Sequence, residues 1–76
     1  MTWNYRVIRY EDGSSGLHEV YYDDNDKITF WTSEPCNFMA WPEEPYAIET
    51  QLVSALNNVR TLPVLILKEL EEKFRK

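Results

Sequence analysis

The chain has few of the residues that build covalent, metal or phosphate sites. Its 76 residues include one cysteine, one histidine and two glycines. A single cysteine, Cys36, allows no intrachain disulfide and is typical of a reducing compartment, so we expect a cytoplasmic protein. One histidine fits no zinc motif, and two glycines are too few for a phosphate-binding loop. We therefore expect no metal and no cofactor.

Long hydrophobic stretches are also missing. The first residues run directly into a strand-like pattern, without the basic and apolar segments of a signal peptide. The longest apolar run, Val64 to Leu67, is far too short to span a bilayer. No membrane association is expected.

Basic residues are scarce in the first part of the chain. Residues 1–50 carry three basic and ten acidic side chains, whereas residues 51–76 carry five basic and three acidic ones. Clustered Lys and Arg are needed to bind phosphate backbones, so this charge balance argues against nucleic acid as a partner. A basic protein would be attracted to the acidic half instead.

Aromatic residues, in contrast, are abundant, and ten of the eleven precede position 47. They alternate along three segments that predict strands at about 3–10, 17–22 and 27–32. The turn-forming stretches at 11–16 and 23–26 connect these segments, which predicts a three-stranded antiparallel meander.

The predicted strands are apolar on both faces. The opposed sets are Tyr5 and Val7 against Ile8 and Tyr10, Val20 and Tyr22 against Leu17 and Tyr21, and Ile28 and Phe30 against Trp31. A sheet with one solvated face would alternate apolar and polar residues. One helix covers one face only, so the second face is covered by something else or is a binding surface.

Helical spacing begins after the prolines. The apolar residues Ile48, Leu52, Ala55, Leu56 and Val59 recur at helical spacing and predict a helix from about Pro45 to about Asn58. For the C-terminal segment, one alternative is a helix starting near Pro63, and the other is an extended stretch over 62–66 with helix only from Leu67; we favour helix for 68–74. The predicted fold is a single two-layer α+β domain over residues 1–76.

The loop between the sheet and the first helix has an unusual composition. Residues 33–45 contain three prolines together with Phe38, Met39 and Trp41, which are residue types enriched at interface cores. The alternative, slightly favoured, is that this cluster is a plug that fills the end of a small core. The candidate interaction residues are Trp3, Tyr5, Tyr21, Trp31, Phe38, Met39 and Trp41.

Two residues have side chains that could carry chemistry. His18 lies inside a predicted strand and is either a general base or a histidine packed among tyrosines. Cys36 has no cation beside it in sequence, which favours a structural thiol over a nucleophile. No catalytic residue is assigned.

The first 32 residues resemble a family of short bacterial proteins of unknown function. The residues that carry this resemblance are Trp3 to Ile8 (WNYRVI), Leu17 to Asp23 (LHEVYYD), Lys27-Ile28 and Trp31-Thr32. The order of three strands followed by a helix is also similar to HicB-type antitoxins, a resemblance that implies neutralisation of a partner ribonuclease. The proline-rich loop departs from that pattern.

Three functional hypotheses follow. The first is a non-enzymatic interaction module that binds a protein, or a second copy of itself, through its aromatic sheet face and residues 36–41. The second is an antitoxin-like regulator whose acidic half masks a basic toxin. The third is a small-ligand or enzymatic pocket lined by His18, Arg6 and tyrosines.

Overall fold

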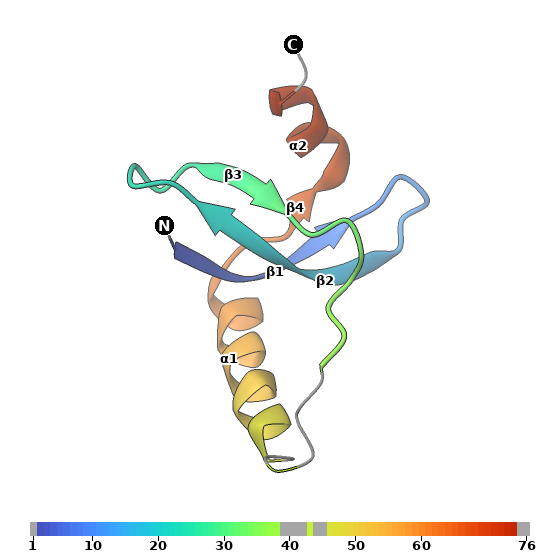
Figure 1. Cartoon of the computed structure of the whole chain (residues 1–76). Coiled ribbons are helices and arrows are strands. Elements are labelled where there is room, and N and C mark those ends of the chain that lie inside the picture. Colours follow the sequence, from blue (N-terminus) through green and yellow to red (C-terminus); the bar gives the residue numbers. More distant parts are fainter. Residues whose placement is uncertain (1, 39–42, 44–45, 75–76) are drawn as a thin grey trace.

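A four-stranded sheet lies between two helices. The computed structural model describes residues 2–38, 43 and 46–74. The elements are β1 (Thr2–Arg9), β2 (Ser15–Tyr22), β3 (Ile28–Trp31), α1 (Ala47–Thr61), β4 (Leu65–Ile66) and α2 (Leu67–Phe74). The predicted α+β class is confirmed, but α1 and α2 lie on opposite sides of the sheet in Figure 1, in place of the two layers expected.

The first three strands form the predicted meander. β1 pairs with β2 and β2 pairs with β3, both antiparallel. Gly13 and Asp26 have φ angles of 91° and 60° in the two connecting turns. These are positions where only glycine, or an Asp or Asn residue, adopts left-handed backbone at small cost.

The prediction of three strands is wrong in number, because β4 adds a fourth strand parallel to β1. A residue before proline avoids the helical region, and Leu62 accordingly is extended and ends α1 ahead of Pro63. The chain stays extended long enough for Leu65 to pair with Ile8. The extended alternative for this segment is therefore confirmed at Leu65–Ile66, with helix from Leu67 onward.

A bulge in β3 changes which side chains share a face. The pairing of β2 with β3 skips Thr29, and an extra residue reverses the alternation of the strand. Ile28 and Trp31 consequently both pack on the α2 side, whereas Phe30 contacts Tyr21 on the α1 side. The expectation that Ile28 and Phe30 share a face is wrong.

The main core lies between the sheet and α2. Ile8 and Val20 are completely buried there, and Leu70 of α2 packs against them. Partly buried side chains surround this cluster, namely Tyr10, Tyr22, Ile28, Trp31, Leu65 and Leu67. The core is small, because the buried apolar residues among those described are Tyr5, Ile8, Val20, Ala55 and Leu70.

Helix α1 extends away from the sheet, as Figure 1 shows, and only its C-terminal part lies close to β1. Ala55 is its one buried residue among those described, whereas Leu52 and Leu56 of the predicted apolar stripe are about half exposed. The helix predicted over 45–58 is confirmed in type, with Pro45 outside the described residues. Its expected packing across a sheet face is not found.

A side-chain hydrogen bond attaches α1 to the sheet. β1 pairs with β4 only at Ile8 and Arg9, so the rest of that edge has unpaired backbone groups. The Tyr5 backbone N–H donates to Asn58 Oδ1 at 2.9 Å. Asn58 therefore takes the place of a neighbouring strand at this position.

We predict that Asn58→Ala lowers the free energy of unfolding by about 1 to 3 kcal/mol, because the Tyr5 N–H loses its acceptor in a partly buried place. Asn57→Ala is the matched control, since Asn57 is exposed and the gain in helix propensity is the same. Urea denaturation of both variants measures the difference. Equal stability of the two variants would contradict this role for Asn58.

Candidate interaction surface

Five aromatic rings form a connected group on the α1 side of the sheet. We call Trp3, Tyr5, Tyr21, Phe30 and Phe38 the aromatic face. Ring centroids are 5.1 Å apart for Trp3 and Tyr5 and 6.2 Å apart for Trp3 and Tyr21. Phe38 lies 5.8 Å from Tyr5, and Phe30 lies 5.6 Å from Tyr21. Such contacts hold rings in fixed orientations.

The backbone after β3 positions Phe38 in this group. This segment follows β2, because the Thr32 N–H donates to the Glu19 carbonyl and the Cys36 N–H donates to the Leu17 carbonyl. Phe38 therefore lies beside Tyr5, which is 7% exposed. Trp3 and Phe30, at the ends of the group, are 49% and 59% exposed.

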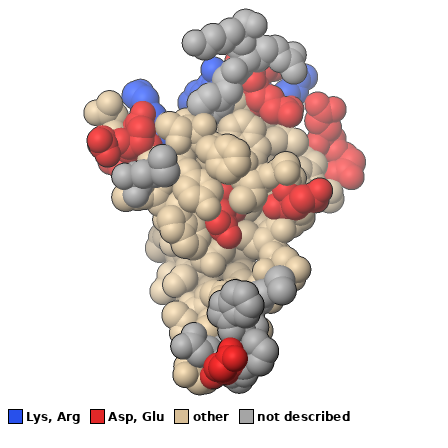
Figure 2. Space-filling view, viewed as in Figure 1, with Lys and Arg blue, Asp and Glu red and all other residues tan. Residues whose placement is uncertain are grey.

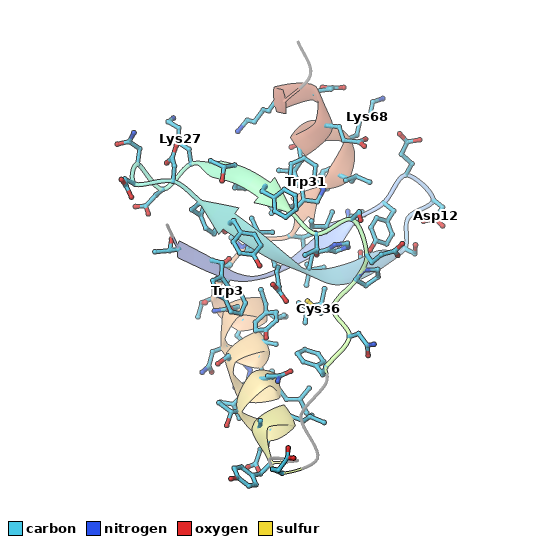
Figure 3. All side chains as sticks on the ribbon, viewed as in Figure 1. Trp3, Asp12, Lys27, Trp31, Cys36 and Lys68 are labelled. Atoms are coloured by element: carbon cyan, nitrogen blue, oxygen red, sulfur yellow. The ribbon has the colours of Figure 1, made fainter. Side chains whose placement is uncertain are left out.

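The structure brings together four of the seven residues proposed from sequence: Trp3, Tyr5, Tyr21 and Phe38. Figure 3 shows Trp3 on the α1 side and Trp31 on the α2 side, where Trp31 packs against the core. Met39 and Trp41 lie outside the described residues. Phe30 was missed, although its alternation with Trp31 along the strand was the signal that could have identified it.

Helix α1 adds a second apolar area. Leu52, Val53, Leu56 and Val59 are between 43% and 52% exposed, and we call them the α1 stripe. At 100° per residue, these positions fall on one side of the helix. Asn58 lies on the opposite side of the helix, where it accepts the hydrogen bond from β1. Ala55 lies at the edge of the stripe next to Val59 and is buried.

The polar groups near the aromatic face remain mostly uncharged. The Tyr21 hydroxyl donates to the Glu19 carboxylate at 2.6 Å, and this hydrogen bond is the main reason that the pKa of Tyr21 is raised. Burial, followed by the charges of Cys36 and Glu19, raises the pKa of Tyr5. Both phenols are therefore neutral at physiological pH.

His18 lies on the opposite side of the sheet and has partners at both ring nitrogens. Nδ1 donates to the Thr32 carbonyl oxygen at 2.8 Å, and Nε2 shares a short hydrogen bond with the Tyr10 hydroxyl. Gly16 makes room for this arrangement, because a Cβ there would overlap the Tyr10 hydroxyl. His18 is 2% exposed, and it lines neither the cavity beside Arg6 nor the one beside Arg9.

Cys36 is half-buried beside the aromatic face. Burial raises the pKa of its thiol, and the nearby Glu19 carboxylate raises it further. A raised pKa lowers the fraction of thiolate at every pH below it, so the thiol is a poor nucleophile at neutral pH.

We predict that the pH midpoint for alkylation of Cys36 by iodoacetamide is higher in the folded protein than in the protein unfolded by urea. The reason is that burial and Glu19 disfavour the thiolate in the folded state only. The measurement uses the midpoint and not the rate, because steric protection slows alkylation without moving the midpoint. A midpoint equal to or below that of the unfolded chain would contradict the assignment.

Comparison of the chain with family models, curated proteins and solved structures finds no match. Within the described ranges, no group of three or more His, Cys, Asp or Glu side chains is arranged to hold a metal ion. Neither described helix has the length and apolar character needed to cross a membrane.

Proposed function

We propose that the protein is a small non-enzymatic interaction module that binds a protein partner through the aromatic face and the α1 stripe, and that this partner is a second copy of the chain. The observation that carries the proposal is the α1 stripe, four apolar side chains exposed along one side of a helix. Exposed apolar residues that gather on one surface indicate an interaction site, whereas single ones do not.

The amount of exposed surface supports a partner. The chain exposes 5995 Å², whereas a compact monomer of 9.1 kDa exposes about 4,900 Å². The radius of gyration is 13.5 Å, compared with about 11 Å for a compact domain of this length. The excess of about 1,100 Å² is more than the roughly 800 Å² that one partner contributes to a standard interface.

The charges on α1 favour a second copy as the partner. Glu49 is in the first turn and Arg60 is in the last turn, and their spacing of eleven residues places them on the same side as the α1 stripe. A two-fold axis pairs the same surface on both copies, so antiparallel α1 helices would place Glu49 beside Arg60 of the other copy. Val53 would then lie opposite Leu56 across the axis.

The distribution of charged side chains on the surface is consistent with an interface at α1. On the face shown in Figure 2, the Asp and Glu side chains gather around the sheet and α2, whereas the visible described atoms below the sheet are mostly uncharged except at the lower tip. Acidic groups around an apolar area keep a protein soluble and leave the area itself free for contact.

We predict that light scattering during size-exclusion chromatography gives twice the 9.1 kDa mass of one chain for the wild type. Leu56→Lys places a charge in the middle of the interface and should give the monomer mass at the same concentration. Thr50→Lys is the matched control, because Thr50 is exposed on the same helix away from the stripe. A wild-type monomer at high concentration would contradict self-association.

We further predict that Glu49→Arg and Arg60→Glu each weaken the dimer roughly tenfold, because each change makes two favourable charge pairs repulsive. The double variant restores both pairs and should return to the wild-type affinity. Glu71→Arg is the control for a similar charge change on α2. Equal weakening by all of these variants would show that total charge, and not the antiparallel pairing, controls association.

A further inference from the structure

A cavity of about 640 Å³ lies on the other side of the sheet, between the β2–β3 hairpin and α2. The residues that line it come from β1, the end of β2, the hairpin, β4 and α2. Its volume is within the range of small-molecule sites. The aromatic face and the α1 stripe do not contribute to it, so the cavity is separate from the proposed interface.

Arg6 is the buried charge of this cavity. Its side chain is 8% exposed, and its guanidinium donates to the Tyr22 hydroxyl at 2.8 Å and to the Pro63 carbonyl oxygen at 2.9 Å. Both acceptors are uncharged. Nε is buried without a hydrogen-bond partner, and no carboxylate of the described residues forms an ion pair with Arg6.

A buried cation without a counter-ion is unfavourable, because the loss of hydration is not offset by an opposite charge. The positive charge of Arg6 is therefore buried without an ion-pair partner among the described residues. An anion in the cavity would supply the missing charge, and a carboxylate matches the planar fork of a guanidinium.

The rest of the lining defines the kind of anion. The cavity also carries Lys27 and Lys73, and the acidic residues Asp26 and Glu69; these four side chains are all exposed. With Arg6 included, basic side chains outnumber acidic ones there, in a chain whose net charge is −5. The other lining residues are mainly apolar: Ile28, Val64, Leu65, Ile66 and Leu70.

We propose that this cavity binds a small organic acid, with its carboxylate at Arg6 and an apolar body along β4 and α2. The buried cation gives the site its selectivity for a carboxylate. The apolar walls favour an acid with an apolar body over an anion without one, since only such a body removes Ile28 and Leu65 from water and gains binding free energy.

The test is a titration of the wild-type protein followed by NMR. Octanoate should give saturable shifts at the Arg6 Nε–H and at the Ile28 and Leu70 methyl groups, and no shifts at Leu56 of the α1 stripe. Octanamide has the same alkyl chain as octanoate but no charge, and it should bind at least tenfold more weakly. Inorganic phosphate is an anion without an alkyl chain and should give no saturable shifts at Ile28 and Leu70.

Each alternative result overturns the proposal. Equal binding of octanoate and octanamide would show that Arg6 does not select a carboxylate. Saturable binding of phosphate at the cavity would show that the apolar walls do not matter. Shifts confined to the α1 stripe, or no saturable shifts, would show that the cavity is not the binding site.

Two variants extend the test. Arg6→Gln should reduce octanoate affinity at least tenfold and leave octanamide affinity unchanged. Because Arg6 is buried and its replacement can destabilise the fold, Val64→Trp serves as a second variant. Val64 is 45% exposed and lines the cavity, so a larger ring there should block octanoate while the far-UV circular dichroism stays that of the wild type. Unchanged octanoate binding in Val64→Trp would overturn the assigned location.

Discussion

β1 and β2 carry apolar side chains on both faces, and the described chain has two helices to cover them. α2 meets this need on one side, where Leu70 closes over Ile8 and Val20. On the other side Asn58 joins α1 to β1 by a hydrogen bond, and Ala55 is the one buried residue of α1 among those described. A sheet that is apolar on both faces requires a covering layer on each. The incomplete second layer accounts for the exposure of Trp3 and Phe30 at the ends of the aromatic face and for the exposed α1 stripe.

Pro63 links the two sides of the sheet. It holds Leu62 in an extended conformation, which ends α1 and directs the chain into β4. Its carbonyl oxygen also accepts a hydrogen bond from Arg6, which places the guanidinium under the cavity beside α2. One short segment thus sets both the direction in which α1 leaves the sheet and the position of the buried cation.

The sequence predicted the parts of the structure that depend on local spacing. Strands β1, β2 and β3 are visible in the sequence as alternating aromatic and apolar residues, and α1 is visible as apolar residues at helical spacing. Asp26 adopts the left-handed turn conformation that Asp and Asn tolerate. For residues 62–66 the sequence left an extended stretch and a helix as alternatives, because β4 has two residues and is too short to show a period. The Thr29 bulge escaped prediction because it depends on pairing with β2 and not on the β3 sequence.

The candidate sites also differ in whether they depend on local spacing or on contacts between distant residues. Trp3, Tyr5 and Tyr21 share a face through strand alternation and register, which sequence spacing can reveal. The Arg6 cavity depends on a contact between residues 57 positions apart, and a single arginine in a strand normally indicates a solvated position. The attachment of α1 to β1 includes the Asn58 hydrogen bond to Tyr5, and helical periodicity does not predict this contact.

The central claim, that a second copy covers the α1 stripe, is tested most directly by an isotope-filtered nuclear Overhauser experiment. Labelled and unlabelled chains are mixed so that only contacts between different copies give signals. A dimer paired through antiparallel α1 helices should give a signal between the Val53 methyls of one copy and the Leu56 methyls of the other. Signals between copies that involve α2 but not α1, or no signals between copies at high concentration, would contradict it.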